Sequence, residues 1–381
     1  MTSTTAGEDR DEIIEGNDHG SLHAAGFNAH RQLNSETTED LRNFEVIRAN
    51  AKNSRVLFAG WSTTVIIDKT RILSFGHQRI EQDLGLTAQE LHSAIGDHDG
   101  LKACVDEAGS LYIVEGDSSG GYTLKCKSSD ASPRIGRLAL ASNNRIAMTA
   151  KQAPNGNLCH LTEFETYESF VRWYEDPSGE DNYPVSHHML PGRPKDLQSN
   201  IASFILLFND GSVWTWGDSR YQSLGRRVTG DDATPAHQPG VVEDLGGLVI
   251  QSIAAGGWQA AAISKDKALY LWGATSPGNE DRIKSLEPGE LSLVTIAEGP
   301  ESEPLDVSNV SIGNNHIAAV ADGRLYVAGQ NSNGQLGLNR PDAFLADWHK
   351  VEQLTDVRQV TCGHASTFAL TVEPLHSAEK S

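Results

Sequence analysis

Basic residues are scarce in this chain of 381 residues, which has 31 Lys and Arg against 51 Asp and Glu and a formal net charge of −20. Non-specific binding to nucleic acid depends on cations that neutralise phosphates, so this balance argues against direct nucleic-acid binding. It also disfavours attachment to an anionic membrane surface. We therefore expect a protein partner, and the charge favours a basic one.

Cysteines and long apolar runs are scarce as well. The four cysteines are scattered and form no CxxC pair, which disfavours both a disulfide framework and a zinc site. The sequence has no apolar signal core and no uninterrupted apolar run of about 18 residues. We expect an intracellular protein, cytoplasmic or nuclear or both, and a monomer.

Motifs for cofactors and metals are missing too. We find no Walker loop, no GxGxxG between a strand and a helix, no HExxH and no EF-hand loop. His187 and His188 are adjacent, so on a strand they would point to opposite faces. His160 and the run Asp97-His98-Asp99 lack the spacing of a ligand set. We predict no cofactor, no bound metal and no catalytic residue.

One short motif does resemble a catalytic one. Residues 116–120 read Gly-Asp-Ser-Ser-Gly and fit GxSxG, with Ser118 as the nucleophile. That motif requires a strand, a sharp turn and then a helix. Residues 122–126, which follow it, alternate like a strand instead. We interpret the motif as a turn between two strands, and an enzyme that uses Ser118 is the last-ranked alternative.

What the sequence does contain is an internal repeat. Residues 60–76, 256–273 and 313–329 align from glycine to glycine with spacings of 16, 17 and 16. Each holds two short apolar runs around a polar turn, as in Asp322-Gly323, which is typical of a β-hairpin. A fourth copy covers residues 206–217, and weaker ones cover 103–116 and about 138–164. The glycines that mark these units are Gly60, Gly76, Gly217, Gly256, Gly273, Gly313, Gly329 and Gly363.

The two ends of the chain complete one further unit. Residues 26–33 repeat residues 329–336, with Gly, Asn, Gln and Leu at identical offsets. The first half of that unit is missing from the N-terminal end, whereas residues 360–370 supply a first half without a second. Joining the halves closes a ring and removes exposed strand edges. The joined ends bring the count to seven units.

These residues resemble the repeat of the regulator of chromosome condensation family. The pattern Trp-Gly followed by a Gln-Leu-Gly-like end is clearest in residues 216–225 and 328–337. The resemblance covers about residues 20–373 and implies an all-β fold, a seven-bladed β-propeller with four-stranded blades. Within the family, the sequence resembles small fungal members such as the alpha-tubulin suppressor. Of the family's blade-opening histidines only His316 is kept, since Thr63, Gln259 and Ser366 occupy the equivalent positions.

The domain organisation follows from composition. Residues 1–19 hold six acidic residues and one Arg, and we predict a disordered acidic tail there. Residues 20–373 form the propeller, with insertions at about 165–195 and 276–306, and residues 374–381 form a second tail. The aromatic first insertion is expected to pack and the acidic second one to remain solvated. We also expect a short helix near residues 88–95.

Five residues are candidates for partner binding. Trp61 and Trp258 follow a blade-opening glycine in loops, where aromatic residues on a rigid scaffold are suitable anchors, and packing is the alternative for both. Trp173 and Tyr174 lie in the aromatic insertion, and Asp117 is a loop acid. Trp214, Trp216 and Trp272 sit at strand ends, where burial between blades is expected.

The functional hypothesis is a non-catalytic interaction scaffold. By the resemblance, its partner is a small metalloprotein of the tRNA wobble-uridine and diphthamide modification pathways, or a histone surface or demethylase on chromatin. The alternative, also from the resemblance, is guanine-nucleotide exchange on a small GTPase. An exchange factor of this fold uses a wedge inserted in one blade, for which residues 116–137 are the candidate because Gly120-Gly121 interrupts that blade.

Overall fold

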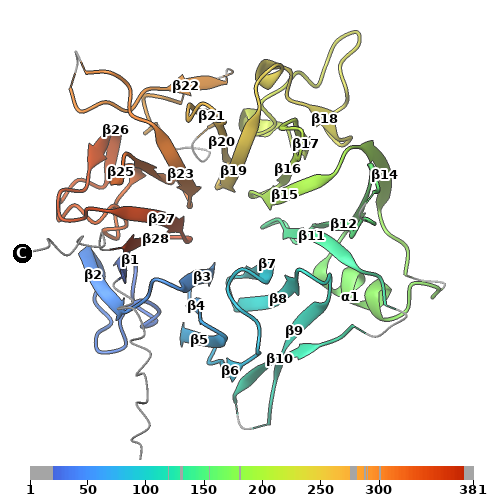
Figure 1. Ribbon diagram of the computed structural model, residues 1–381, viewed down its shortest axis with the longest axis horizontal. Coiled ribbons are helices and arrows are strands. Elements are labelled where there is room, and N and C mark those ends of the chain that lie inside the picture. The colour runs from blue at the N-terminus through green and yellow to red at the C-terminus, as the bar shows by residue number, and fades with distance from the viewer. Residues whose placement is uncertain are drawn as a thin grey trace, which may run out of the picture.

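The computed structural model describes residues 20–118, 120–128, 132–153, 155–179, 182–274, 281–286, 289, 291–299 and 302–372. Seven antiparallel sheets of four strands surround a central axis, as Figure 1 shows in the view along that axis. The fold is an all-β, seven-bladed propeller, as the repeat predicts. We number the blades in chain order and the strands of each blade from the axis outward.

The first three blades come from the N-terminal half. Blade 1 contains β3 (Ser54–Ala59), β4 (Thr63–Asp68), β5 (Arg71–Gly76) and β6 (Glu81–Asp83). Blade 2 contains β7 (Leu91–Asp97), β8 (Gly100–Asp106), β9 (Leu111–Gly116) and β10 (Tyr122–Cys126). Blade 3 contains β11 (Ile135–Leu140), β12 (Ile146–Ala150), β13 (Leu158–Phe164) and β14 (Ser186–Pro191), with helix α1 (Tyr167–Glu175) between the last two.

Three more blades follow along the chain. Blade 4 contains β15 (Pro194–Ser199), β16 (Ser203–Phe208), β17 (Val213–Gly217) and β18 (Gly240–Val241). Blade 5 contains β19 (Ile250–Gly256), β20 (Gln259–Ser264), β21 (Leu269–Gly273) and β22 (Ser292–Val294). Blade 6 contains β23 (Val307–Ile312), β24 (His316–Ala321), β25 (Arg324–Gln330) and β26 (Phe344–Lys350). Two short 3-10 turns, η1 (Arg220–Gln222) and η2 (Glu243–Leu245), flank β18.

Blade 7 joins the two ends of the described chain. Its inner strands are β27 (Val357–Cys362) and β28 (Ser366–Val372), and its outer strands are β1 (Gly20–Gly26) and β2 (Leu41–Ala49). β28 pairs with β1 in register from Gly20↔Val372 to Gly26↔Ser366. The prediction that the ends share one closing blade is therefore confirmed. The ring closes through main-chain hydrogen bonds between segments that lie far apart in sequence.

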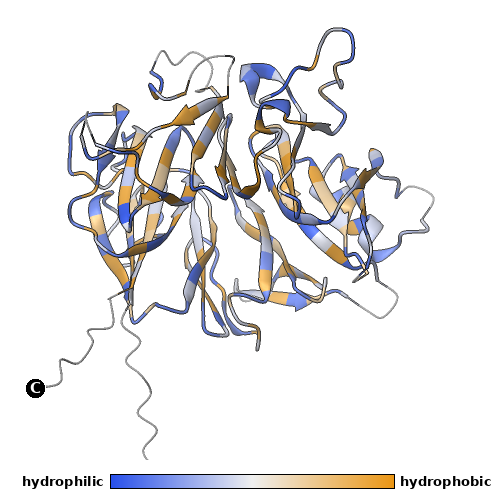
Figure 2. Cartoon of the chain, turned by 45° about the horizontal axis from the view of Figure 1, so that its top comes forward, coloured by the Kyte–Doolittle hydropathy of each residue, from blue (hydrophilic) through white to orange (hydrophobic). Residues whose placement is uncertain are grey.

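The core consists of seven hydrophobic clusters in the described residues, one between each pair of neighbouring blades. Figure 2 shows hydrophobic residues concentrated along the strands, with hydrophilic ones toward the loops. Trp216 and Trp272 are buried in these clusters, and the Trp272 indole donates to the Ser223 carbonyl oxygen at 3.1 Å. Their predicted burial between blades is confirmed.

The repeated glycines explain why the blades look alike in sequence. Gly76 ends the third strand of blade 1 with φ +98°, and a Cβ there would lie 2.1 Å from the Ser62 carbonyl oxygen. Gly26, Gly217, Gly273 and Gly329 also have positive φ and the same close approach to a loop carbonyl. L side chains rarely adopt this conformation, so only glycine fits without strain.

The blade-opening glycines serve the contact between blades instead. A Cβ on Gly256 would lie 2.3 Å from the Ile312 carbonyl oxygen, and one on Gly313 would lie 2.5 Å from that of Gly363. At Gly60 it would lie 3.2 Å from the Asp97 carbonyl oxygen of blade 2, and at Gly363 it would lie 2.9 Å from the Ala59 carbonyl oxygen of blade 1. Glycine at these positions allows neighbouring inner strands to come close together.

The antiparallel order gives the ring two distinct faces. We call the face where the innermost strands begin the start face, and the face where they end the end face. Loops from first to second strand and from third to fourth strand lie on the end face. Hairpins from second to third strand and links to the next blade lie on the start face. Because Gly20 pairs with Val372, the chain enters and leaves the ring on the start face.

Two local expectations are corrected. Residues 88–95 do not form a helix, because β7 (Leu91–Asp97) is the inner strand of blade 2. Helix α1 lies instead in the aromatic insertion, where Thr166 caps it through a reciprocal hydrogen-bond pair with Ser169. α1 has nine residues, and no helix in the described part of the chain is long and apolar enough to cross a membrane.

The acidic insertion is described only in part. Within it, Ile283 and Leu286 are buried between blades 5 and 6, and β22 forms the outer strand of blade 5. These parts pack against the ring, so the prediction that the insertion remains solvated is wrong for them. The predicted tails, residues 1–19 and 374–381, lie outside the described residues.

Candidate functional site

The seven inner strands line a central channel with a volume of about 1190 Å³. At the end face its wall includes Trp61, His98, Asn314 and His364, which come from the first loops of blades 1, 2, 6 and 7. These loops are short and begin at strand ends, so the scaffold holds their side chains in fixed positions. The rim of this mouth is the candidate site.

Trp61 is the main feature of the rim. Its side chain is 38% exposed, which is unusual for a residue of this size. One face of the indole stacks on the Phe27 ring, with centroids 4.2 Å apart and an interplanar angle of 26°. The His364 ring meets it edge-on at 5.1 Å. Trp61 therefore presents apolar surface to solvent while aromatic neighbours fix its orientation.

A glutamine connects the two loops that carry the stacked rings. The Gln32 amide donates to the carbonyl oxygens of Phe27 at 2.9 Å and Trp61 at 3.0 Å. Asn28 organises the first loop, since its side chain accepts from the Leu33 and Asn34 amides and donates to the Asn34 and Thr37 carbonyls. These are the Asn and Gln of the repeated Gly-Asn-Gln-Leu pattern. The pattern thus positions the aromatic pair.

Carboxylates flank the rim on blade 2. The side chains of Asp97, His98 and Asp99 gather within 4.8 Å of one another at the turn between β7 and β8. Asp97 forms an ion pair with Lys102 at 2.9 Å, and His98 contacts Asp99 at 3.3 Å. Ser62, next to Trp61, donates to the His98 carbonyl oxygen at 2.8 Å and ties the two loops together. This arrangement places negative charge beside the exposed indole.

Trp258, the second predicted loop anchor, is buried rather than exposed. Only 7% of it is accessible, and Tyr221 packs on it with ring centroids 4.7 Å apart. The Arg220 guanidinium lies over the same indole at 5.6 Å. Trp258 therefore holds the loop of blade 4 against blade 5. Its burial fits the packing interpretation rather than partner binding.

The aromatic insertion packs as expected, which removes its residues from the surface. Tyr174 on α1 is 2% exposed, and its hydroxyl lies 2.5 Å from the Ser128 hydroxyl. Trp173 is half-buried against Phe164, with centroids 5.1 Å apart. Tyr174 has no accessible surface for a partner, and Trp173 has only part of its own.

The described residues around the GxSxG motif belong to two paired blade strands, β9 and β10. β9 and β10 pair from Gly116↔Tyr122 to Cys126↔Tyr112, and the exposed Asp117 accepts from the Gly121 amide at 2.9 Å across the turn. Ser118 lies in this turn, which is followed by a strand. The turn interpretation of the GxSxG motif therefore fits. The wedge expected at 116–137 is wrong for the described residues, because Gly120-Gly121 shapes a hairpin rather than interrupting the blade.

His316 has a structural place between blades 6 and 7. It is fully buried, and its Nε2 donates to the Ser366 carbonyl oxygen at 3.2 Å. Burial lowers the pKa of His316 to about 4, so the ring is neutral near pH 7. This hydrogen bond joins β24 of blade 6 to β28 of blade 7.

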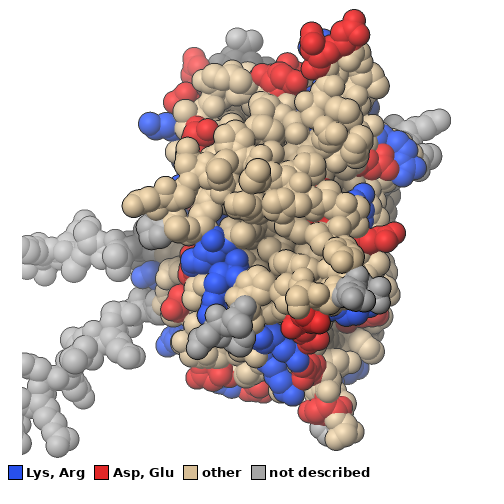
Figure 3. All heavy atoms as spheres, turned by 90° about the vertical axis from the view of Figure 1, so that its right-hand side faces the viewer, with Lys and Arg blue, Asp and Glu red and all other residues tan. Residues whose placement is uncertain are grey.

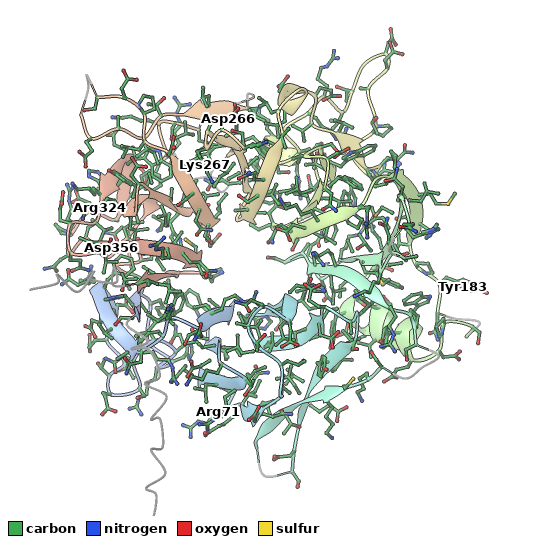
Figure 4. All side chains as sticks on the ribbon, in the orientation of Figure 1. Arg71, Tyr183, Asp266, Lys267, Arg324 and Asp356 are labelled. Carbon is green, nitrogen blue, oxygen red and sulfur yellow. The ribbon has the colours of Figure 1, made fainter. Side chains whose placement is uncertain are left out.

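The outer rim of blade 3 carries a second exposed apolar area. Tyr183, Met189, Leu158 and Val185 are 53–77% exposed there. Tyr183 points away from the channel at the periphery of the ring (Figure 4). On this side of the molecule a broad uncharged area separates charges of both signs (Figure 3). Tyr183 therefore offers an exposed aromatic control that is remote from the channel mouth.

Comparisons with known proteins agree with the repeat. The family model of the regulator of chromosome condensation (RCC1) repeat matches residues 210–263 and 322–370. RCC1 domain-containing protein 1 of Mus musculus is 28% identical over 219 residues, which cover 48% of this chain and 56% of that protein. The ultraviolet-B receptor UVR8 of Arabidopsis thaliana is 32% identical over 47% of this chain and 39% of its own length. The chain thus spans about half the length of the curated relatives it matches.

Solved structures agree on the fold. Prp20p of Saccharomyces cerevisiae, studied for its binding to Gsp1p and histones, superposes with a TM-score of 0.65 and 14% identity, covering 94% of this chain and 92% of that one. Human WBSCR16 superposes with a TM-score of 0.61 and 15% identity, covering 93% and 99% of the two chains. At such low sequence identities, the structural likeness shows a shared propeller fold and says nothing about function.

Sequence reasoning found Trp61 but missed the residues that support it. Phe27 stood within the repeated loop pattern, and Gln32 was noted only as a repeat position. His364 directly follows the blade-opening Gly363, the position that Trp61 occupies after Gly60, but it was not among the predicted anchors. Their meeting depends on ring closure, because Phe27 and His364 come from opposite ends of the chain and converge on blade 1 in space.

Proposed function

Starting from a seven-bladed propeller that carries RCC1 repeats, we propose that this chain is a non-catalytic protein-interaction scaffold. It docks a basic protein partner on the end face, at the channel rim around Trp61. RCC1-type propellers include both interaction proteins and nucleotide-exchange proteins, so the assignment between the two rests on the site.

The exposed, pre-oriented indole of Trp61 is the observation that carries the proposal. Interfaces gain most of their free energy from a few residues, among which Trp is enriched. Because Phe27 and His364 already fix the indole, little side-chain entropy is lost when a partner covers it. A loop aromatic on a rigid scaffold is well suited to recognition.

The charge near the rim selects the class of partner. Asp97 and Asp99 lie at the turn between β7 and β8, which Ser62 ties to the Trp61 loop. Lys102 pairs with Asp97 and lines the channel, whereas Glu168, in the first turn of α1, adds a further carboxylate to the channel wall. The whole chain carries a net charge of −20. Such a field attracts a basic protein and speeds its encounter, whereas it repels nucleic acid and acidic proteins.

Histones are the first partner class to test. They are basic, which suits this rim, and Prp20p, a structural neighbour, is known for binding them. A small metalloprotein of the tRNA wobble-uridine and diphthamide pathways is the other candidate, and it rests on the family resemblance. An intracellular location, nuclear or cytoplasmic, is part of the same proposal.

The test is a titration of purified core histones by isothermal calorimetry with three proteins. These are the unmodified chain, Trp61→Ala and the matched control Tyr183→Ala. We expect Trp61→Ala to lose about tenfold in affinity, the effect of removing a moderate hot spot. The control should bind like the unmodified chain, since Tyr183 is remote from the rim. Equal affinity of all three proteins would remove Trp61 from the interface.

The same preparation separates the scaffold from an exchange factor. An exchange factor accelerates GDP release from a small GTPase in catalytic amounts, whereas a scaffold only binds in stoichiometric amounts. Among the described residues of the predicted wedge, residues 122–126 pair with β9 as the outer strand of blade 2, which does not favour exchange. We therefore expect no acceleration by trace amounts of the chain.

A further inference from the structure

The outer part of blade 3 brings together two histidines from different strands. The imidazole rings of His160 on β13 and His187 on β14 have centroids 5.5 Å apart and are tilted by 39°. β14 is the outermost strand of this blade and lies at the periphery of the ring in Figure 1. Spacing along the sequence does not reveal this pair, because the contact depends on how the two strands pair.

The strand register adds a thioether to the same face of the sheet. β13 and β14 pair His160 with Met189 and Thr162 with His187. Residues that are directly paired across antiparallel strands point to one face, and so do residues two apart on one strand. His160, His187 and Met189 therefore share a face. His188 points to the opposite face.

The three side chains are accessible from the solvent. His160 and His187 are exposed, and Met189 is 64% exposed, which is high for an apolar residue. Among the residues that the structure describes, neither imidazole ring has a hydrogen-bond partner. The lone pairs of the ring nitrogens are therefore free to bind an ion.

The distance between the two imidazoles suits a shared metal ion. With metal–nitrogen bonds of about 2.1 Å, two imidazoles on one trigonal or tetrahedral ion have ring centroids about 5–6 Å apart. The observed separation of 5.5 Å lies in this range. Met189 is directly opposite His160, and its long, unbranched side chain has three rotatable bonds. Its sulfur can therefore reach an ion held by the two rings.

The donor set selects the kind of ion. Mg²⁺ and Ca²⁺ prefer oxygen ligands, which this set lacks. Imidazole suits copper, zinc and nickel, whereas a thioether is a soft ligand that favours Cu(I). Leu158 lies two residues before His160 on the same face and is 53% exposed, so apolar surface adjoins the donors. Two imidazoles and one thioether together favour Cu(I).

The charges near the donors are few. Lys151 lines the same surface recess of about 450 Å³ as His160, but it is exposed, so water and salt screen its charge. Glu163 lies on the opposite face of the sheet, where it accepts a hydrogen bond from Ser186 at 2.9 Å. The net charge of −20 favours the approach of a cation.

We propose that His160, His187 and Met189 form a surface site for a copper(I) ion, with two imidazole nitrogens and one thioether sulfur as its ligands. Binding changes no oxidation state, since the ion enters and leaves as Cu(I). The ligands lie on the surface rather than in a closed cage, so the ion is exchanged without unfolding of the blade. The inference concerns the outer rim of blade 3 and is independent of the docking proposed at Trp61.

The first test is an anaerobic titration of the full chain with Cu(I) in competition with the coloured chelator bicinchoninate. Every protein carries Cys126→Ser, because Cys126 is an exposed thiol that binds Cu(I) by itself. We expect one equivalent of Cu(I) to transfer to the chain. His160→Gln and His187→Gln should each weaken binding about 10–100-fold, the loss seen when even a supporting group of a metal site is removed. Absence of transfer would overturn the proposal.

Met189→Leu distinguishes a copper site from a pair of histidines alone. Leucine keeps the apolar character of the side chain and removes the sulfur. We expect Cu(I) affinity to fall about tenfold and Zn²⁺ affinity to remain the same, because zinc in proteins takes nitrogen, thiolate and oxygen ligands. Equal Cu(I) affinity of Met189→Leu and the unaltered site would overturn the assignment of the thioether.

The matched control is His237→Gln, which replaces an exposed histidine in a loop of blade 4. We expect it to bind Cu(I) like the protein that carries Cys126→Ser alone, and thermal unfolding confirms that each variant is folded. Equal losses in His237→Gln and His160→Gln would overturn the site.

X-ray absorption at the copper edge gives a second measurement on the same proteins. We expect nitrogen and sulfur neighbours around the ion, with the sulfur contribution lost in Met189→Leu. A spectrum of the unaltered site with nitrogen and oxygen neighbours only would overturn the proposal.

Discussion

The indole of Trp61 lies flat on the ring of Phe27, with centroids 4.2 Å apart, across the junction where blade 7 meets blade 1. Phe27 follows the third strand of the closing blade, and Trp61 follows the inner strand of the first blade. The pair exists only in the closed ring. Closure of the propeller and assembly of the proposed partner site are therefore the same structural event.

This relationship predicts a role for Phe27 in binding without direct contact to the partner. In Phe27→Ala the Trp61 indole loses the ring on which it stacks. Its orientation then has to become fixed when the partner binds. We expect affinity to fall about three- to tenfold, with about 1–2 kcal/mol lost in the free energy of unfolding. Calorimetric titration and urea unfolding measure the two quantities. Unchanged affinity in a folded variant would show that the stack does not prepare the site.

The repeated glycines predict a sharp contrast between two positions that align in sequence. Gly76→Ala places a methyl group 2.1 Å from the Ser62 carbonyl oxygen at a φ of +98°, so strain and overlap add. We expect a loss of at least about 3 kcal/mol in the free energy of unfolding. In Gly116→Ala the methyl group would lie 3.5 Å from the Tyr122 ring and 4.0 Å from the Gly121 carbonyl oxygen, which are ordinary contacts, so the change should be tolerated. Urea unfolding of both variants tests the contrast, which fails if the losses are equal.

Asn28 and Asn331 should make comparable contributions to stability from opposite ends of the chain. Both are buried and link their loop through several main-chain hydrogen bonds. Alanine at either position leaves buried main-chain amide and carbonyl groups without hydrogen-bond partners. Each unsatisfied group lowers the free energy of unfolding by about 1–3 kcal/mol. Hydrogen exchange should show loss of protection in residues 28–37 for Asn28→Ala and in residues 331–342 for Asn331→Ala. Protection that remains in both loops would contradict the role.

The buried histidines predict a pH dependence of stability. The pKa values of His316 and His92 are about 4 in the folded chain, below the ordinary value of 6.5, mainly because of burial. Between these values the unfolded chain binds more protons, so the free energy of unfolding falls as pH is lowered from about 6.5 to about 4. Each histidine contributes at most about 1.4 kcal/mol per pH unit.

Comparison of the unmodified chain with His92→Asn isolates one of these groups. The variant should lose less stability between pH 7 and pH 5 in urea unfolding. Parallel pH profiles for the two proteins would show that His92 titrates alike in both states.

The sequence predicted the ring because its marker residues have few alternatives. Gly26 and Gly329 occupy the same strained position, and Asn28 and Asn331 the same hydrogen-bonding position, so the matching patterns identified the two halves of blade 7. Short apolar strands without such markers were harder to recognise. Residues 88–95, for which a helix is expected, lie outside a marked repeat and instead contribute to the inner strand β7.

The candidate site was predicted only in part. Trp61 and Trp258 occupy equivalent places after a blade-opening glycine, yet Tyr221 covers one and solvent reaches the other. The covering loop comes from the neighbouring blade, and its path depends on tertiary packing that a single sequence does not contain.

The measurement that tests the central claim most directly is a comparative purification of the tagged chain from its native cells at low and moderate salt. It uses the unmodified protein, Trp61→Ala and Tyr183→Ala, with mass spectrometry of the retained proteins. The account predicts one dominant basic partner, weakened by salt, absent with Trp61→Ala and present with Tyr183→Ala. Retention of that partner by Trp61→Ala, or loss of it only with Tyr183→Ala, would contradict docking at the end-face rim.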